Sequence, residues 1–257
     1  IGPIETPYGG PIVRKELNKE EITSVYNKLL RHFGSFRASS YSIDSVIGFQ
    51  EEVFTNNGYS LSSKVSSVLN LSDGKELLMK KMRRNHKRQL KKARKNKLEI
   101  VFDKDFIHLN DYYDLLKDTY SRLQSKNIVD FSFYQHSVKT LKSTDRIHLI
   151  MIKQGDVFVA GGLILYYLDT VIFWRGATRE DAMQIGASNL LYWSIICWAL
   201  DRDCNYLDTL HNPNKSLEHF KRGFGCKEYT SWRAHKESRI WSNIKAIKNF
   251  INQFSIH

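Results

Sequence analysis

Residues 186–229 hold the side chains of this chain whose types and order best suit chemistry. Their pattern predicts a buried helix, a short strand, an Asn-Pro-Asn loop, a second helix that ends at Gly223, and a return into another strand. The second helix carries the pair Phe220-Lys221. This order of elements and side chains is typical of folds that hold an activated carbonyl donor. Because acyl transfer passes through a tetrahedral oxyanion, such a site needs a positive or hydrogen-bonding group.

Polar residues on two neighbouring predicted strands are further candidates. Arg175 follows Trp174 in an apolar strand, where a guanidinium needs a carboxylate or a phosphate as partner. A structural partner is the alternative to a ligand. Asp208 lies inside the strand after the buried helix, where it is a candidate general base or orienting group. A structural hydrogen bond is the alternative for Asp208.

Three more residues are candidates for binding a substrate. His211 and Asn212 lie at the mouth of the strand that contains Asp208 and are expected to line a cleft there. Tyr192 lies on the buried helix. Its position favours a place in the core, with substrate binding as the alternative.

The hydrophobic pattern places these residues on a regular framework. Three apolar strands joined by tight turns predict an antiparallel meander. The next helix is apolar nearly all round and must be buried, and its length makes it a crossover between two parallel strands. The elements predicted for this half are strands at 147–152, 157–167 and 171–177, a helix at 189–200, a strand at 205–210, a helix at 215–222, a strand at 227–235 and a helix at 241–254.

The first half repeats this order weakly. It predicts a helix at 19–33, a strand at 36–43, a short helix at 49–54 and a strand at 61–71. We interpret residues 1–100, with a basic helix over 75–97, as a partial, degenerate copy of residues 101–257. Two connecting helices are expected within 106–142. A chance likeness of the two halves is the alternative.

The basic helix is a local concentration of charge. Lys80 to Lys97 contains eleven Lys or Arg and no acid, and removing these from the total of 39 leaves 28 basic against 27 acidic residues. An apolar stripe should seat this helix on the body; it consists of Leu78, Met82, Leu90 and Ala93. The residues expected to face outward and bind a polyanion are Arg83, Arg84, Lys87, Arg88, Lys91 and Arg94. Nucleic acid, an anionic membrane surface and a lipid-linked phosphate remain open as partners, and a solvated face is the alternative.

Composition limits the class of protein. The chain has 257 residues, of which 42% are hydrophobic, as in a folded globular protein. No apolar run approaches the roughly 20 residues that span a bilayer, and nothing at the start resembles a signal peptide. The three cysteines are Cys197, Cys204 and Cys226. Their odd number and spacing argue against a disulfide framework and a zinc site and suit a reducing cytoplasm.

The run FKRGFG at Phe220–Gly225, together with the helix from Asn189, resembles the second half of FemAB-type transferases. These are GNAT-fold aminoacyl transferases of peptidoglycan cross-bridges, with acyltransferase relatives in surface-polysaccharide clusters. The basic helix with the strand 98–102 and the residues Tyr8–Pro11 also resemble this family. The likeness covers most of the chain, but only the FKRGFG region is specific. It implies an α+β fold with a GNAT-like mixed sheet flanked by helices, in which the first of two fused halves lacks its opening strands.

The resemblance also implies roles for residues. Lys221 would lie at the junction of donor and acceptor and stabilise the oxyanion, and Phe220 would pack beside the donor. Phe220 and Trp174 would shape the substrate cleft where the sheet opens, and Arg175 would bind a carboxylate or phosphate there. The acceptor would be an amine of a sugar or peptide precursor of the cell wall or a surface polysaccharide. The bland alternative for Lys221 is a solvated helix lysine.

The donor is left open between aminoacyl-tRNA and acyl-CoA, neither of them a permanently bound cofactor. Acetyl-CoA-dependent GNAT proteins hold the pyrophosphate with an Arg/Gln-x-x-Gly-x-Gly/Ala loop at a helix N-terminus. The corresponding residues Met183–Ser188 match only at Gly186, which favours a donor held otherwise, such as aminoacyl-tRNA. Three rivals remain: an acetyl-CoA-dependent N-acyltransferase, a lipid aminoacyl transferase, and a non-catalytic scaffold that binds RNA or an anionic membrane.

Overall fold

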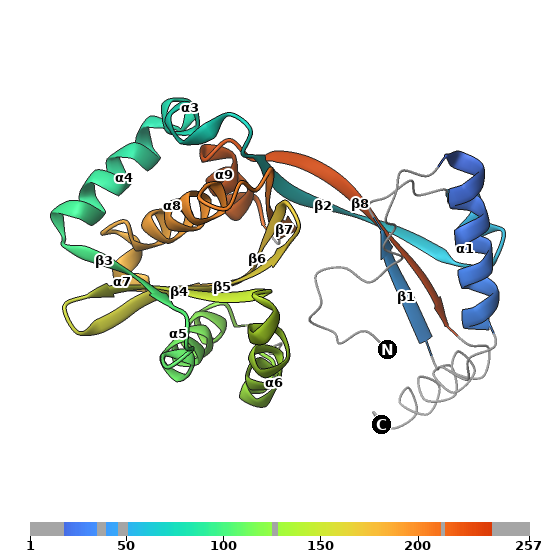
Figure 1. Ribbon diagram of the computed structural model, residues 1–257, viewed down its shortest axis with the longest axis horizontal. Coiled ribbons are helices and arrows are strands. Elements are labelled where there is room, and N and C mark those ends of the chain that lie inside the picture. The colour runs from blue at the N-terminus through green and yellow to red at the C-terminus, as the bar shows by residue number, and fades with distance from the viewer. Residues whose placement is uncertain (1–17, 35–39, 46–50, 125–127, 212–213, 238–257) are drawn as a thin grey trace, which may run out of the picture. The chain divides into compact units, whose positions relative to one another are not determined.

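The computed structural model of the chain describes residues 18–34, 40–45, 51–124, 128–211 and 214–237 (Figure 1). Two compact units are formed, one by residues 1–65 with 230–257 and the other by residues 66–229. The helices are α1 (Lys19–Gly34), α2 (Glu51–Thr55), α3 (Gly74–Lys81), α4 (Arg84–Lys95), α5 (Leu109–Arg122), α6 (Phe131–Leu141), the 3-10 turn η1 (Lys142–Thr144), α7 (Glu180–Met183), α8 (Ala187–Leu200) and α9 (Lys215–Gly223). The strands are β1 (Ser40–Ser45), β2 (Ser60–Asn70), β3 (Leu98–Asp103), β4 (Ile147–Gln154), β5 (Val157–Tyr167), β6 (Thr170–Thr178), β7 (Tyr206–His211) and β8 (Lys227–Glu237).

The smaller unit has its own apolar core. β1 pairs antiparallel with β8, from Ser40 opposite Glu237 to Ser45 opposite Trp232. The buried side chains of this core are Tyr26, Leu30, Phe54, Tyr59 and Ala234. The ring of Phe54 meets those of Tyr26 and Tyr59 edge to face, which is a favourable aromatic geometry.

The larger unit is a mixed sheet with helices on both faces, as the sequence predicted. Within it the strand order is β2-β7-β6-β5-β4-β3. The predicted meander is confirmed, because β4, β5 and β6 pair antiparallel in sequence order. The predicted crossover is also confirmed, because α8 connects β6 to β7 and these two strands pair parallel. The turn of chain between β4 and β5 passes through Gly155, whose φ is +59°.

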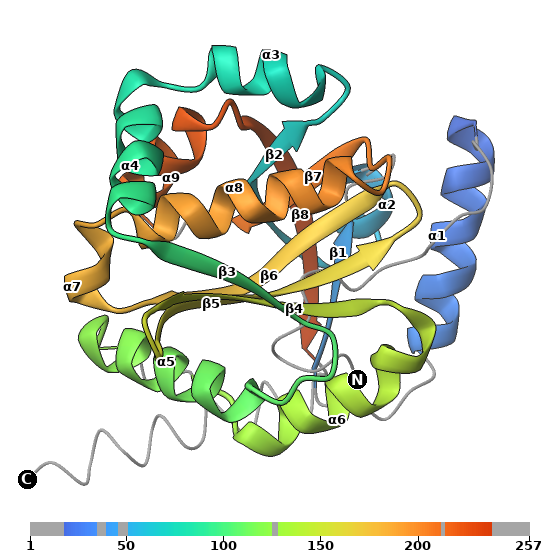
Figure 2. The ribbon, with the colours of Figure 1, turned by 60° about the vertical axis from the view of Figure 1, so that its left-hand side comes forward.

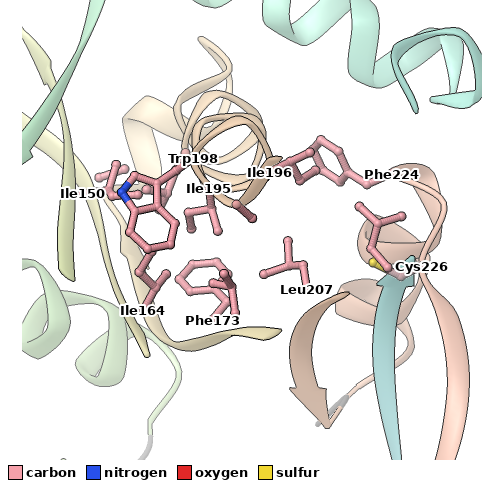
Figure 3. Close-up of a cluster of buried hydrophobic side chains, with 14 of the residues drawn as sticks. Ile150, Ile164, Phe173, Ile195, Ile196, Trp198, Leu207, Phe224 and Cys226 are labelled. Atoms are coloured by element: carbon pink, nitrogen blue, oxygen red, sulfur yellow. The ribbon is translucent and has the colours of Figure 1, made fainter. Parts of the chain in front are cut away.

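The sheet of this unit has an apolar core on each face, and different helices cover the two cores. α8 packs on one face together with α3 and α4, while α5 and α6 cover the other face (Figure 2). Figure 3 shows side chains of α8 between the sheet residues Ile150, Ile164 and Phe173 on one side and Phe224 on the other. α8 is therefore enclosed by apolar side chains, which explains why its sequence is apolar nearly all round.

Several predictions differ from the structure or fall outside it. The single basic helix predicted over 75–97 is wrong: α3 and α4 are separate, and Met82 and Arg83 between them have extended backbones with ψ of 140° and 142°. The strand predicted at 36–43 is observed at 40–45, with 35–39 outside the described residues. The helix predicted at 241–254 and the segment Tyr8–Pro11 also lie outside them. The division into halves at residue 100 concerns a repeated order of elements, which the two compact units do not test.

Candidate active site

Lys221 is buried, although it is a lysine on a nine-residue helix. α9 begins at Lys215 after Asn214, whose side-chain oxygen accepts a hydrogen bond from the backbone N–H of Leu217. Leu217 and Phe220 are half-buried, and Lys221 is only 1% exposed. The interpretation of Lys221 as a solvated helix lysine is therefore wrong.

The ammonium group of Lys221 meets the end of β7. Its Nζ donates to the carbonyl oxygens of Thr209 at 2.5 Å, Leu210 at 3.1 Å and His211 at 3.2 Å. Three consecutive carbonyls converge on one nitrogen only where the strand leaves the extended conformation, and Leu210 has a left-handed φ of +61°. Three N–H groups thus meet three acceptors, which is how a buried cation is satisfied.

Asp208 supports this turn. Its Oδ1 accepts a hydrogen bond from the backbone N–H of Leu210 at 2.7 Å, the two-residue pattern by which aspartate stabilises turns. Asp208 is buried, with 8% of its surface exposed. The structure therefore gives Asp208 a structural hydrogen bond, which was the alternative in the sequence analysis, and its role as general base or orienting group stays a prediction.

The buried position controls the charge of Lys221. Burial lowers its pKa to about 8, while nearby Cys226 and Asp208 act in the opposite direction. Burial also raises the pKa of Cys226 to about 12, so this thiol is neutral at physiological pH. Below pH 8 the site therefore contains one positive charge held by backbone dipoles.

This charge lies where two parallel strands stop pairing. The register of β6 with β7 runs from Thr170 opposite Tyr206 to Ile172 opposite Asp208. Beyond it, β6 continues to Thr178 along β5, and β7 continues to His211 along β2. This is the place at which the sequence analysis expected the sheet to open.

β6 carries a bulge immediately after this point. Phe173 lies opposite Ile164 and Arg175 opposite Leu163, so Trp174 is an extra residue in β6. The Trp174 ring is 6% exposed and packs against rings of α6, among them Phe133 and Tyr134 with centroid distances of 5.9 and 6.0 Å. Trp174 therefore belongs to the core on the α6 side of the sheet. The sequence analysis expected it to shape a cleft and did not predict this packing.

Arg175 follows this bulge and is half-buried. Its backbone carbonyl accepts a hydrogen bond from the hydroxyl of Tyr112 at 3.1 Å. Burial lowers the pKa of the Arg175 guanidinium. The bulge thus places a partly desolvated cation on β6, close in sequence to the point where β6 and β7 separate.

The aromatic candidates form a packed cluster. Phe220 is half-buried, and its ring lies 4.9 Å from that of Tyr192 and 5.4 Å from that of Phe224. Tyr192 also meets Phe173 at 4.8 Å, and burial raises the pKa of its hydroxyl. Tyr192 and Phe220 both pack against the apolar core around α8, which for Tyr192 is the place that its position favoured. The expected place of Phe220 beside the donor stays a prediction.

The remaining candidates lie at the end of β7. His211 is exposed, and its backbone carbonyl is one of the three acceptors of Lys221. Asn212 lies outside the described residues.

The sequence analysis missed His86, the first buried residue of α4. Its ring packs 5.1 Å from Phe220 and 4.5 Å from Phe224, and its Nε2 lies 2.8 Å from the carbonyl oxygen of Phe220. His86 lies four and seven residues before Leu90 and Ala93, so it belongs to the stripe that seats the helix. That spacing was the signal in the sequence, and the surrounding cations obscured it.

The predicted stripe and outward face of the basic segment are largely confirmed. Leu78, Met82 and Ala93 are buried and Leu90 packs against the same core. The exposed residues are Arg83, Arg84, Arg88, Lys91 and Arg94. Lys87 is half-buried, and its Nζ donates to the carbonyl of Lys80. Binding of a polyanion by this face stays a prediction.

Gly186 packs directly against the backbone of α4. It precedes α8 with a φ of +91°, and a Cβ at this position would lie 2.4 Å from the carbonyl oxygen of Gln89 and 3.3 Å from the Cβ of Ala93. The basic helix therefore lies against the N-terminus of α8. The glycine that partly matched a pyrophosphate-binding loop has a structural reason of its own.

Comparisons with known proteins identify the family and the fold of the chain. The model of a family described as "Acetyltransferase (GNAT) domain" matches residues 80–222. No curated protein sequence matches the chain. The structure is similar to a crystal structure of FemX, with a TM-score of 0.70 and 12% identity over 90% of this chain and 81% of the other.

Two further solved structures share the fold. One is the C-terminal domain of a putative lysylphosphatidylglycerol synthetase from Agrobacterium fabrum, with a TM-score of 0.60 and 11% identity over 87% of this chain and 76% of the other. The other is L-PGS from Bacillus licheniformis, with a TM-score of 0.58 and 11% identity over 86% and 74%. These likenesses confirm the expected α+β fold.

We predict that Gly186→Ala destabilises the protein more than Gly155→Ala. Both glycines have positive φ, but a Cβ at Gly155 meets none of the described atoms within 4 Å, whereas at Gly186 it meets the backbone of α4. Gly155→Ala should lower the free energy of unfolding by about 1 kcal/mol, and Gly186→Ala by about 3 kcal/mol. Urea denaturation measures both. Equal losses would show that α4 is not held against Gly186.

We also predict a pH signature of Lys221. Between pH 8 and the ordinary lysine pKa of 10.5, the unfolded chain binds a proton that the folded chain releases. The contribution of this residue to stability therefore increases as the pH rises from 8 to 10.5 and is complete above 10.5. It is lost again as the pH falls back through 8. Relative to Lys221→Met, the free energy of unfolding of the parent protein should rise by up to about 3 kcal/mol over the interval.

Chemical denaturation at a series of pH values gives this difference. Lys215→Met, which removes an exposed lysine of the same helix, is the matched control. A difference between the parent and Lys221→Met that stays constant from pH 7 to 10.5 would contradict the lowered pKa.

Proposed function

Since the chain belongs to the acetyltransferase (GNAT) domain family, we propose that it transfers an aminoacyl or acyl group to an amine of a cell-wall or surface-polysaccharide precursor. The observation that carries this proposal is the buried ammonium of Lys221 at the point where β6 and β7 stop pairing. A charge fixed in a desolvated place stabilises an oxyanion far more than the same charge in water.

The chemistry assigns roles to few residues. The acceptor amine attacks the donor carbonyl, a C–N bond forms, and the bond to the ribose oxygen or the CoA sulfur breaks. The proton that the amine loses goes to the departing oxygen or sulfur, which leaves as the ribose hydroxyl or the CoA thiol. The oxyanion of the intermediate would take the place of the weakest carbonyl contact of Lys221, the one to His211 at 3.2 Å. Asp208 keeps the turn at Leu210 in place, and Arg175 would bind a carboxylate or phosphate of a substrate.

The donor that these surfaces favour is aminoacyl-tRNA. α4 lies against Gly186, at the helix end where an acetyl-CoA-dependent relative is expected to hold the pyrophosphate. The exposed face of α4 offers Arg84, Arg88 and Lys91, spaced to lie along one side of the helix. Such a face suits successive phosphates of a nucleic acid. The name of one structural neighbour, lysylphosphatidylglycerol synthetase, also denotes an aminoacylated product.

The acceptor and the place of reaction follow from the resemblance to FemAB-type transferases. The acceptor would be an amine on a sugar or peptide precursor, with peripheral contact to an anionic membrane where that precursor is lipid-linked. In the part of the chain that the structure describes, no helix is both long and apolar enough to cross a membrane. The three free cysteines suit a reaction in the reducing cytoplasm.

A donor competition tests the proposal. The protein is incubated with an amine-bearing cell-wall precursor and either a mixture of radiolabelled aminoacyl-tRNAs or labelled acetyl-CoA. We expect label to enter the precursor from aminoacyl-tRNA, and Lys221→Met to reduce the rate about 100-fold or more. Lys215→Met should keep the parent rate. Transfer from acetyl-CoA alone would establish the rival donor, and full activity of a folded Lys221→Met would refute the role of Lys221.

A second prediction concerns the basic face. The triple variant Arg84→Ser, Arg88→Ser, Lys91→Ser should weaken binding of unfractionated tRNA and reduce the slope of log K against log salt by about 0.9 for each phosphate that the variant no longer binds. The control variant Lys104→Ser, Lys139→Ser, Lys227→Ser removes three exposed lysines elsewhere on the same unit. It loses as many positive charges as the variant of the basic face. Fluorescence anisotropy at several salt concentrations measures both. Equal weakening by the two variants would show attraction to net charge and not to this face.

A further inference from the structure

The last turn of α9 is capped by residues from the α3–α4 segment. A helix end leaves carbonyl groups without partners in the helix. The backbone N–H of Arg83 donates to the carbonyl of Gly223 at 2.9 Å, and the Nε2 of His86 lies 2.8 Å from the carbonyl of Phe220. The Arg83 guanidinium also contacts His219, with 2.6 Å to its Nε2 and 3.3 Å to its carbonyl oxygen. Residues more than 130 positions away thus complete the helix that carries Lys221.

The hydrogen bond fixes the state of the His86 ring. A carbonyl oxygen only accepts, so Nε2 must be the protonated nitrogen. The other nitrogen, Nδ1, is buried and has no hydrogen-bond partner among the described residues. Burial lowers the pKa of His86, which agrees with a neutral ring. His86 is thus a single, directed donor to the residue that precedes Lys221.

The fit around His86 is tight. A Cβ at Gly223 would lie 2.2 Å from the His86 Nε2. Gly223, the first glycine of the FKRGFG run, is therefore needed for this contact. Because Met82 and Arg83 are extended, the chain can turn from α3 into α4 while Arg83 reaches the end of α9. α4 presents His86 on its buried side and Arg84, Arg88 and Lys91 on its exposed side.

We propose that His86 is a positioning residue that links the polyanion-binding face of α4 to the placement of Lys221. The hydrogen bond to Phe220 holds the last turn of α9, so that the Lys221 ammonium reaches the carbonyls of β7. A polyanion on the exposed face of α4 steadies that helix and, through His86, the ammonium. This coupling rests on the proposed function only for the identity of the polyanion.

Side-chain NMR of Lys221 tests the positioning without an activity assay. In protein labelled with ¹⁵N-lysine, the Lys221 ammonium signal is assigned by its loss in Lys221→Arg, and its hydrogen exchange is measured. We expect His86→Phe, which keeps a ring but no donor, to speed this exchange about tenfold. His86→Gln, which can again donate to the Phe220 carbonyl, should restore it to within about twofold of the parent.

Two controls separate positioning from general loosening. Val138→Ala loosens the core under α6, on the other face of the sheet from α4, and should leave the Lys221 exchange unchanged. If His86→Phe does not fold, His86→Asn replaces it, because this shorter amide cannot reach the carbonyl that His86→Gln reaches. Equal exchange in the Phe or Asn variant and in the Gln variant would overturn the proposal.

The coupling has its own readout. Addition of unfractionated deacylated tRNA should slow the Lys221 exchange in the parent protein and leave it unchanged in His86→Phe (or in His86→Asn where that variant replaces it). Where transfer is measurable, the His86 variant should lower kcat about tenfold with an unchanged KM for the donor. Slowing by tRNA in both proteins, or in neither, would overturn the link. Failure of transfer from any donor, with these NMR results intact, would refute the proposed function alone.

Discussion

The structure depends on satisfying one buried ammonium. Removing a lysine from water is costly unless each of its three N–H groups finds an acceptor. Thr209, Leu210 and His211 supply these acceptors, and they can do so only because the backbone turns at Leu210. The same turn ends the regular part of β7 beside the last paired residue of β6. Burial of the cation and departure of β7 from the extended conformation are therefore one structural event, stabilised by the carboxylate of Asp208.

Such a short helix as α9 cannot hold the lysine in place by itself. Isolated helices of fewer than about 12 residues are marginal in water, and α9 has nine. Asn214 caps its first turn, and the α3–α4 segment caps its last turn through Arg83 and His86. Two glycines allow α4 to come this close, Gly186 against its backbone and Gly223 against the His86 ring. The basic helix is therefore a supporting wall of the site as well as a charged surface.

The sequence predicted the framework because periodicity and turn residues encode it locally. The meander β4–β6 and the apolar crossover α8 follow from patterns that tertiary contacts only reinforce. Residue patterns alone left Lys221 open between a site residue and a solvated lysine, and the resemblance to a known family placed it at the junction of donor and acceptor. Neither predicted that its side chain is buried. No Gly or Pro marks the break between α3 and α4 in the sequence. The break is stabilised by a hydrogen bond from Arg83 to Gly223, which is distant in the sequence, so a local pattern could not predict it. His86 had the spacing of a core residue, yet eleven surrounding cations made the helix look like a surface element.

The positive charge of this protein is divided between two environments, and screening separates what each can do. Charges on the exposed face of α4 act through water, where salt weakens them beyond about 8 Å at physiological ionic strength. Lys221 is 1% exposed, so its field passes mainly through protein and salt has little effect on it. The first arrangement suits the capture of a large anion, and the second suits stabilisation of a small charge that exists only during a reaction. A single packed helix, α4, separates the two arrangements: its outer side faces the solvent and its inner side reaches α9 through His86.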